Sequence, residues 1–138
     1  MVTAVVLGLY LITLGVVALS PVSPIDGLDL SQELDATGLG WVTYTQLESF
    51  ANVLLFVPFG LLIALLSPTR WWWAVVVGLI LAAICIELGQ AAFLPGRVAS
   101  LGDVTANSTG GVVGVLIAAI IRGIGWAIRR GRRTEYPS

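Results

Sequence analysis

Four long apolar blocks constrain the fold of this chain more than any other feature. They occupy about residues 2–19, 49–66, 71–92 and 103–121. Each block is close to the ~20 residues that a helix needs to cross the hydrocarbon core of a bilayer. Hydrophobic residues make up 57% of the chain and charged residues 11%, a balance that soluble domains do not show. The sequence therefore predicts an all-α integral membrane bundle of four transmembrane helices, forming a single domain over residues 1–138.

The charges between the blocks predict the orientation of the bundle. Residues 20–48 form an acidic loop without a basic residue, whereas six of the seven arginines lie in the 67–70 turn and in the tail 122–138. Positive charge favours the cytoplasmic side of a membrane. We therefore expect a multi-pass protein of the cell (plasma) membrane, with the N-terminus and the C-terminus cytoplasmic and the acidic loop outside. The basic tail is interpreted as a topology anchor that also touches anionic lipid.

The first block is interpreted as a transmembrane helix and not as a cleaved signal peptide. No basic residue precedes it, and its apolar stretch is longer than that of a usual signal peptide. Pro21 and Pro24 end the helix, because proline lacks the amide donor. Pro58, inside the second block, predicts a kink for the same reason.

Composition excludes several classes of site. The chain has no histidine, which rules out a histidine-containing zinc site and a Ser-His-Asp triad. Its single cysteine, Cys85, cannot form a disulfide within the chain. No metal, cofactor or nucleic-acid partner is expected.

Polar residues within the apolar blocks are costly and are therefore candidates for function. Under the predicted topology they converge on the outer side of the membrane, because each lies near the outer end of its helix or in the outer loop. Glu87 and Gln90 lie three residues apart and share one helix face, as do Asp103 and Asn107, which lie four apart. The predicted ligand-binding residues are Asn52, Glu87, Gln90, Arg97, Asp103 and Asn107.

Each of these residues also has a structural interpretation. Glu87 and Arg97 could neutralise each other in an ion pair, Asp103 could cap a helix, and Asn107 could serve helix packing. Gly110 and Gly114 have the small-xxx-small spacing that lets helix backbones approach closely, so a helix-packing partner is expected there. In the functional interpretation Arg97 holds an anionic group, and Glu87 or Asp103 transfers a proton.

A discontinuous set of these motifs resembles the VanZ-like family of bacterial membrane proteins. The segments that carry the resemblance are Asn52-Val53-Leu54-Leu55-Phe56-Val57-Pro58-Phe59-Gly60, Glu87-Leu88-Gly89-Gln90, Pro95-Gly96-Arg97, and Asp103 with Asn107, Gly110 and Gly114. Ser100 departs from the family pattern, since relatives often have an acidic residue at that place. The resemblance implies an envelope protein, and the family's namesake is associated with resistance to the glycopeptide antibiotic teicoplanin.

Together these features predict a VanZ-like cell-envelope protein whose outward polar pocket binds an anionic component, such as a lipid head group or a peptidoglycan precursor. Membrane lipids are its expected partners. The alternative is a membrane enzyme that acts on a lipid-linked substrate, with Glu87 or Asp103 as the catalytic acid or base. A transporter is disfavoured because the inner halves of the helices are apolar. A purely structural bundle is the remaining interpretation.

Overall fold

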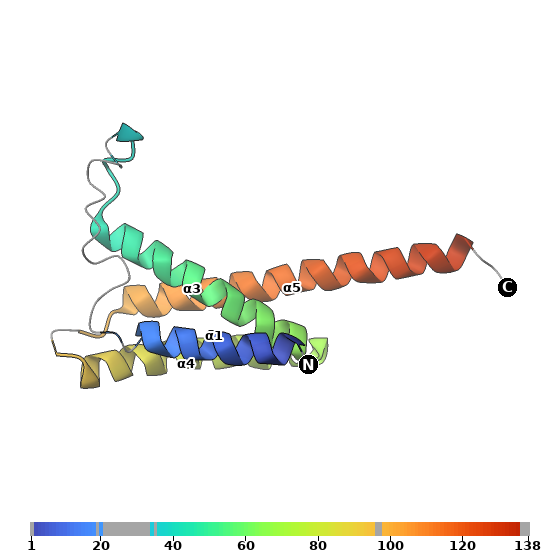
Figure 1. The fold of residues 1–138 in the computed structure, drawn as a ribbon, viewed down its shortest axis with the longest axis horizontal. Coiled ribbons are helices and arrows are strands. Elements are labelled where there is room, and N and C mark those ends of the chain that lie inside the picture. Colours follow the sequence, from blue (N-terminus) through green and yellow to red (C-terminus); the bar gives the residue numbers. More distant parts are fainter. Residues whose placement is uncertain (1, 19, 21–33, 35, 96–97, 136–138) are drawn as a thin grey trace.

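The computed structural model describes residues 2–18, 20, 34, 36–95 and 98–135. This part of the chain contains four α-helices and one turn of 3-10 helix, in the order α1 (Val2–Ala18), α3 (Tyr44–Leu66), η1 (Thr69–Trp71), α4 (Trp72–Phe93) and α5 (Leu101–Glu135). Successive α-helices run in opposite directions, so α1 begins at the end of the bundle toward which α5 runs (Figure 1).

The described helices have the length and composition of membrane spans. Three of them are long and apolar enough to cross a bilayer, over Tyr44–Leu66, Thr69–Phe93 and Leu101–Gly131, and Val2–Ala18 is a shorter apolar helix. Large apolar side chains, including Leu9, Ile12 and Leu54, are exposed on the outer faces of the helices. Such faces suit lipid and not water. The prediction of an all-α membrane bundle is confirmed.

The closest contact in the bundle joins α3 to α5, and glycines make it possible. A Cβ atom added to Gly60 would lie 2.0 Å from the carbonyl oxygen of Gly111, and one added to Gly114 would lie 2.2 Å from that of Val57. A Cβ at Gly110 would lie 2.2 Å from the carbonyl oxygen of Val53. The expected packing role of Gly110 and Gly114 is thus seen within the chain itself, against α3, where backbone meets backbone.

Two helix boundaries differ from the predicted ones. α3 begins at Tyr44 and not near residue 49, because Thr43 and Gln46 form a capping box: the Gln46 amide donates to Oγ1 of Thr43 (3.3 Å), and the Thr43 amide donates to Oε1 of Gln46 (2.8 Å). This pair satisfies amides that otherwise have no partner at a helix start. α5 continues to Glu135, so most of the segment 122–138 is helical and projects past the other helices (Figure 1).

A second set of contacts fixes the opposite end of α3. Arg122 donates to the carbonyl oxygen of Leu65 (2.8 Å), and Nε1 of Trp72 donates to that of Ala64 (3.1 Å). The Arg122 guanidinium also stacks over the Trp72 ring at 5.3 Å. These donors satisfy carbonyls that a helix C-terminus leaves unpaired, and the positive charge suits the helix dipole there. Arg122 therefore joins α5 to the last turn of α3.

α3 also continues through Pro58 without a break in the helix. The Tyr10 hydroxyl of α1 donates to the carbonyl oxygen of Leu55, less than one turn before the proline. Apolar side chains fill the space between the helices, with Leu14, Phe56, Phe59, Leu79 and Val115 among those buried. The core therefore contains side chains from α1, α3, α4 and α5.

Candidate functional site

The predicted polar residues gather at one end of the bundle. At this end α1 and α4 finish, and α3 and α5 begin (Figure 1). The convergence that the sequence predicted from helix direction and spacing is present for the residues that the structure describes, namely Asn52, Glu87, Gln90, Asp103 and Asn107. Arg97 lies outside the described residues.

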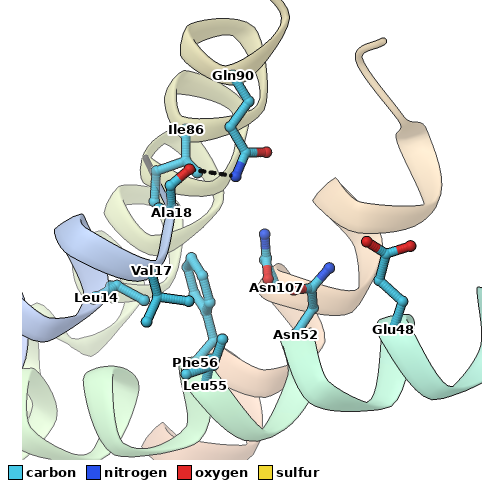
Figure 2. Close-up of a pocket in the computed structure, with 10 residues that line it drawn as sticks. All are labelled: Leu14, Val17, Ala18, Glu48, Asn52, Leu55, Phe56, Ile86, Gln90 and Asn107. Atoms are coloured by element: carbon cyan, nitrogen blue, oxygen red, sulfur yellow. Dashed lines mark hydrogen bonds between the residues drawn. The ribbon is translucent and has the colours of Figure 1, made fainter. Parts of the chain in front are cut away.

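A small cavity of about 30 Å³ lies between the four helices at this end. Figure 2 shows the side chains that line it, from α1, α3, α4 and α5. Four lining residues are polar and six are apolar: Glu48, Asn52, Gln90 and Asn107, with Leu14, Val17, Ala18, Leu55, Phe56 and Ile86. Its volume matches the share of one water molecule in liquid water, ~30 Å³. The cavity therefore admits one small polar group, and the rest of any ligand must lie outside it.

Asn52 and Asp103 connect α3 to the first turn of α5. Nδ2 of Asn52 donates to Oδ1 of Asp103 at 3.0 Å. Ser100, immediately before α5, accepts a hydrogen bond at Oγ from the Asp103 amide (3.3 Å) and so occupies the capping position. Asp103 itself is the third residue of the helix, where a carboxylate favours the helix dipole. The capping role considered for Asp103 therefore belongs to Ser100.

Glu87 connects α4 to the start of α5. Its side chain is buried, and Oε1 accepts a hydrogen bond from the Ser100 amide at 2.5 Å. A buried carboxylate needs such partners, because desolvation of its charge is costly. Glu87 does not line the cavity. Its observed contact instead holds the described end of the α4–α5 connection.

Gln90 lies across the cavity from Asn52 and satisfies the end of α1. Its Nε2 atom donates to the carbonyl oxygen of Ala18 at 2.8 Å (Figure 2). The last carbonyls of a helix have no partner within the helix. Gln90 thus lines the cavity but uses an amide donor to join α4 to α1.

Asn107 is the polar side chain that the protein leaves incompletely paired. It is 5% exposed and lines the cavity beside Asn52 (Figure 2). Its Oδ1 atom is buried and has no hydrogen-bond partner among the described residues. A buried acceptor without a partner costs ~1–3 kcal/mol. This oxygen is therefore available to a hydrogen-bond donor that enters the cavity.

Two residues of the site were missed by the sequence analysis. Glu48 lines the cavity, and Ser100 links Glu87 to Asp103. Both had a readable signal. Glu48 lies four residues before Asn52, hence on the same face of a helix that starts early enough to include both. Ser100 precedes Asp103 by three residues, the spacing of a helix cap and its third helical residue.

No group of three or more potential metal ligands occurs among the described residues. The described cavity lining offers two asparagines, a glutamine and a carboxylate, a set suited to hydrogen bonding with an uncharged polar group. Any positive charge near the cavity must come from outside this lining.

A model of the protein family described as VanZ/LLP1 matches residues 5–122. The match includes all four helical spans and every predicted site residue. No curated protein and no solved structure matches the chain.

Proposed function

Because the chain belongs to the VanZ/LLP1 family, we propose that it is a VanZ-like cell-envelope membrane protein whose polar cavity binds an anionic envelope component. The observation that carries the proposal is the buried Oδ1 atom of Asn107, which lines the cavity and has no partner among the described residues. A protein that only needed to pack its helices would gain stability from an apolar side chain at this position.

The proposal gives each polar group a distinct task. Asn107 and Glu48 accept hydrogen bonds from a hydroxyl or amino group that enters the cavity. Arg97 holds the anionic group, such as a phosphate, that remains outside. Arginine suits this task because its planar fork donates two parallel hydrogen bonds to phosphate or carboxylate. Gln90 and Asn52 shape the cavity through their contacts with Ala18 and Asp103.

Orientation is part of the proposal. The excess of arginine in the 67–70 turn and in 122–138 favours a cytoplasmic location for that end of the bundle. The cavity then faces outward, in the plasma membrane, where it meets envelope lipids and peptidoglycan precursors. Teicoplanin carries an acyl chain that inserts in the membrane, so the proposal includes reduced susceptibility to this antibiotic.

A binding role is better supported than the enzyme alternative. Glu87 and Asp103, the candidate acid and base, do not line the cavity. Each accepts a hydrogen bond that joins two segments of the protein, from Ser100 and Asn52 respectively. A general acid or base must reach the proton that it transfers, and neither carboxylate is positioned for that in the cavity.

The test compares Arg97→Ala with the wild type by native mass spectrometry after gentle extraction with lipids. We expect the wild type to retain an anionic lipid or lipid-linked precursor, and the variant to retain roughly tenfold less, as for loss of a charge-assisted hydrogen bond. In a susceptible Gram-positive host, expression of the wild type raises the inhibitory concentration of teicoplanin more than that of vancomycin, and Arg97→Ala reduces this effect.

Arg70→Ala is the matched control, since Arg70 is an exposed arginine of η1 at the opposite end of the bundle. It removes the same charge and should leave retention unchanged. Equal retention by all three proteins would refute the role of Arg97. An unchanged teicoplanin response, with retention intact, would separate this protein from resistance and leave the binding role.

A further inference from the structure

A second, larger hollow lies against the polar cavity. It is a groove of about 400 Å³ between α1 and α4, with Phe59 of α3 at its floor. Its lining is apolar and rich in small residues: Leu11, Leu14, Gly15, Ala18, Phe59, Ala82, Cys85, Ile86 and Gly89. α1 packs on α3 and hardly contacts α4. The groove opens to the lipid-facing surface, because Leu11 and Cys85 are exposed.

The groove and the polar cavity are continuous. Leu14, Ala18 and Ile86 line both of them. Along α1 the groove extends from Leu11 to Ala18, about 10 Å of helix at 1.5 Å per residue. One leaflet of the hydrocarbon core is ~15 Å deep. The groove therefore covers much of the depth of one leaflet and ends at the polar cavity.

Another apolar groove, of about 420 Å³, lies between α3 and α4. It lies toward the opposite end of the bundle, and its lining includes Ser67, Trp71 and Gly78. None of the residues that line the polar cavity lines this groove. The groove between α1 and α4 thus differs in being joined to buried hydrogen-bonding groups.

We propose that the α1–α4 groove and the polar cavity form one binding site for a lipid with a single acyl chain and a hydroxyl group next to the chain. The chain lies in the groove, and the hydroxyl donates to Oδ1 of Asn107. The anionic head group lies beyond the cavity, toward the α4–α5 connection. The inference rests on the proposed function for the head group and adds the lipid class and the path of its chain.

Three observations favour this lipid class. The groove has the volume of a small-molecule site, ~300–1,000 Å³, and the described helices form one such groove at the cavity. The cavity itself admits one small polar group, which a hydroxyl fits. In a lipid with one chain, a free hydroxyl replaces the second ester, directly beside the remaining chain. A diacyl lipid has no donor at that position.

Two glycines allow the groove to be filled without disturbing the bundle. A Cβ added to Gly15 or to Gly89 meets no atom within 4 Å. Gly15→Leu and Gly89→Leu therefore place a side chain in the groove and leave the helix contacts intact. Gly78 also has open space around it but lines the other groove. Gly78→Leu is thus a matched control on the same helix as Gly89.

The experiment offers the purified full chain an equimolar mixture of oleoyl lysophosphatidylglycerol, dioleoyl phosphatidylglycerol and oleoyl lysophosphatidylcholine, and measures retained lipid by native mass spectrometry. We expect preferential retention of lysophosphatidylglycerol by the wild type and by Gly78→Leu. Gly15→Leu and Gly89→Leu should each reduce it about tenfold, the effect of losing about two buried methylene contacts. Asn107→Leu should reduce the preference for the lysolipid over the diacyl lipid. Thermal unfolding in the same detergent checks that each variant is folded.

The remaining outcomes separate this inference from the proposed function. Unchanged retention in Gly15→Leu and Gly89→Leu, with loss in Asn107→Leu, overturns the groove and leaves the polar site. Loss in both glycine variants, with equal retention of the two lysolipids by the wild type, supports the groove and contradicts the anionic head group. Equal retention of all three lipids identifies ordinary bilayer contact and overturns the inference. A dimer that both glycine variants dissociate makes the groove an interface between copies, which also overturns it.

Discussion

The Oδ1 atom of Asn107 is buried in the contact between α3 and α5, where the described part of the protein offers it no donor. Ser108, the next residue, also has a buried oxygen without a partner among the described residues, but Ser108 does not line the cavity. The two residues therefore share the energetic cost and differ in access to a ligand. That difference allows a structural role to be separated from a binding role.

Asn107→Leu should leave the thermal stability of the lipid-free protein unchanged or raise it, because it removes an unsatisfied acceptor worth ~1–3 kcal/mol. The same change should abolish the preference for a lipid with a free hydroxyl. Ser108→Ala should be equally harmless to stability and leave that preference intact. Unfolding midpoints and native mass spectra of the three proteins provide the measurement. A large loss of stability in Asn107→Leu would instead indicate that Asn107 has a packing role.

Sequence alone predicted which polar residues meet, but not what each one does. Helix direction and spacing bring Asn52, Gln90 and Asn107 to one end of the bundle. They do not reveal that Gln90 donates to Ala18, because a partner on another helix depends on how the helices rotate about their axes. Glu48 was missed because the predicted start of α3 fell after it, although the Thr43 and Gln46 pair indicates the earlier start.

At the scale of elements, the α3–α5 contact depends on backbone surfaces without side chains. Gly114 illustrates this, since a Cβ there would lie 2.2 Å from the Val57 carbonyl oxygen and 2.5 Å from the Leu61 amide nitrogen. Neither atom can move without displacing α3. This contact also positions Asn52 and Asn107, which lie on the two helices next to the glycines.

Gly114→Ala should therefore destabilise the protein by ~1–3 kcal/mol, the usual cost of overpacking a close contact. Gly123→Ala, on the same helix, is the control, because a Cβ at Gly123 meets nothing within 4 Å. It should be neutral or slightly stabilising, since alanine favours helix more than glycine does. Thermal unfolding in detergent compares the two variants. Equal midpoints would contradict the backbone contact between α3 and α5.

The elements themselves were the most predictable level of the structure. The apolar blocks place α1 and α4 within one residue of their ends, and the spacing of Gly110 and Gly114 indicates a close helix contact. The partner surface on α3 was not predictable, because Gly60 meets Gly111 only through the crossing of the two helices. The length of α5 was underestimated, since its arginines resemble a loop in hydropathy but are compatible with helix.

For the whole molecule, the orientation in the membrane is the decisive prediction. Cysteines at Gly40, before α3, and at Gly131, near the end of α5, lie in exposed positions, and Cys85→Ala removes the native thiol. In intact cells an impermeant thiol reagent should label position 40 and spare position 131, as the arginine distribution requires. Permeabilised cells provide the control, with both positions labelled. Labelling of position 131 from outside would place the cavity in the cytoplasmic leaflet.

The difference in length between α1 and α5 has a consequence for the surrounding bilayer. As a 17-residue helix, α1 is about 26 Å long, whereas the hydrocarbon core is ~30 Å thick. Such hydrophobic mismatch is relieved by local thinning of the membrane, at a modest energetic cost per ångström. Thinning beside α1 lowers the lipid–water boundary toward Ala18, where the groove and the cavity meet. The short helix thus shortens the distance that a lipid head group must travel to enter, and it favours membranes of lower thickness.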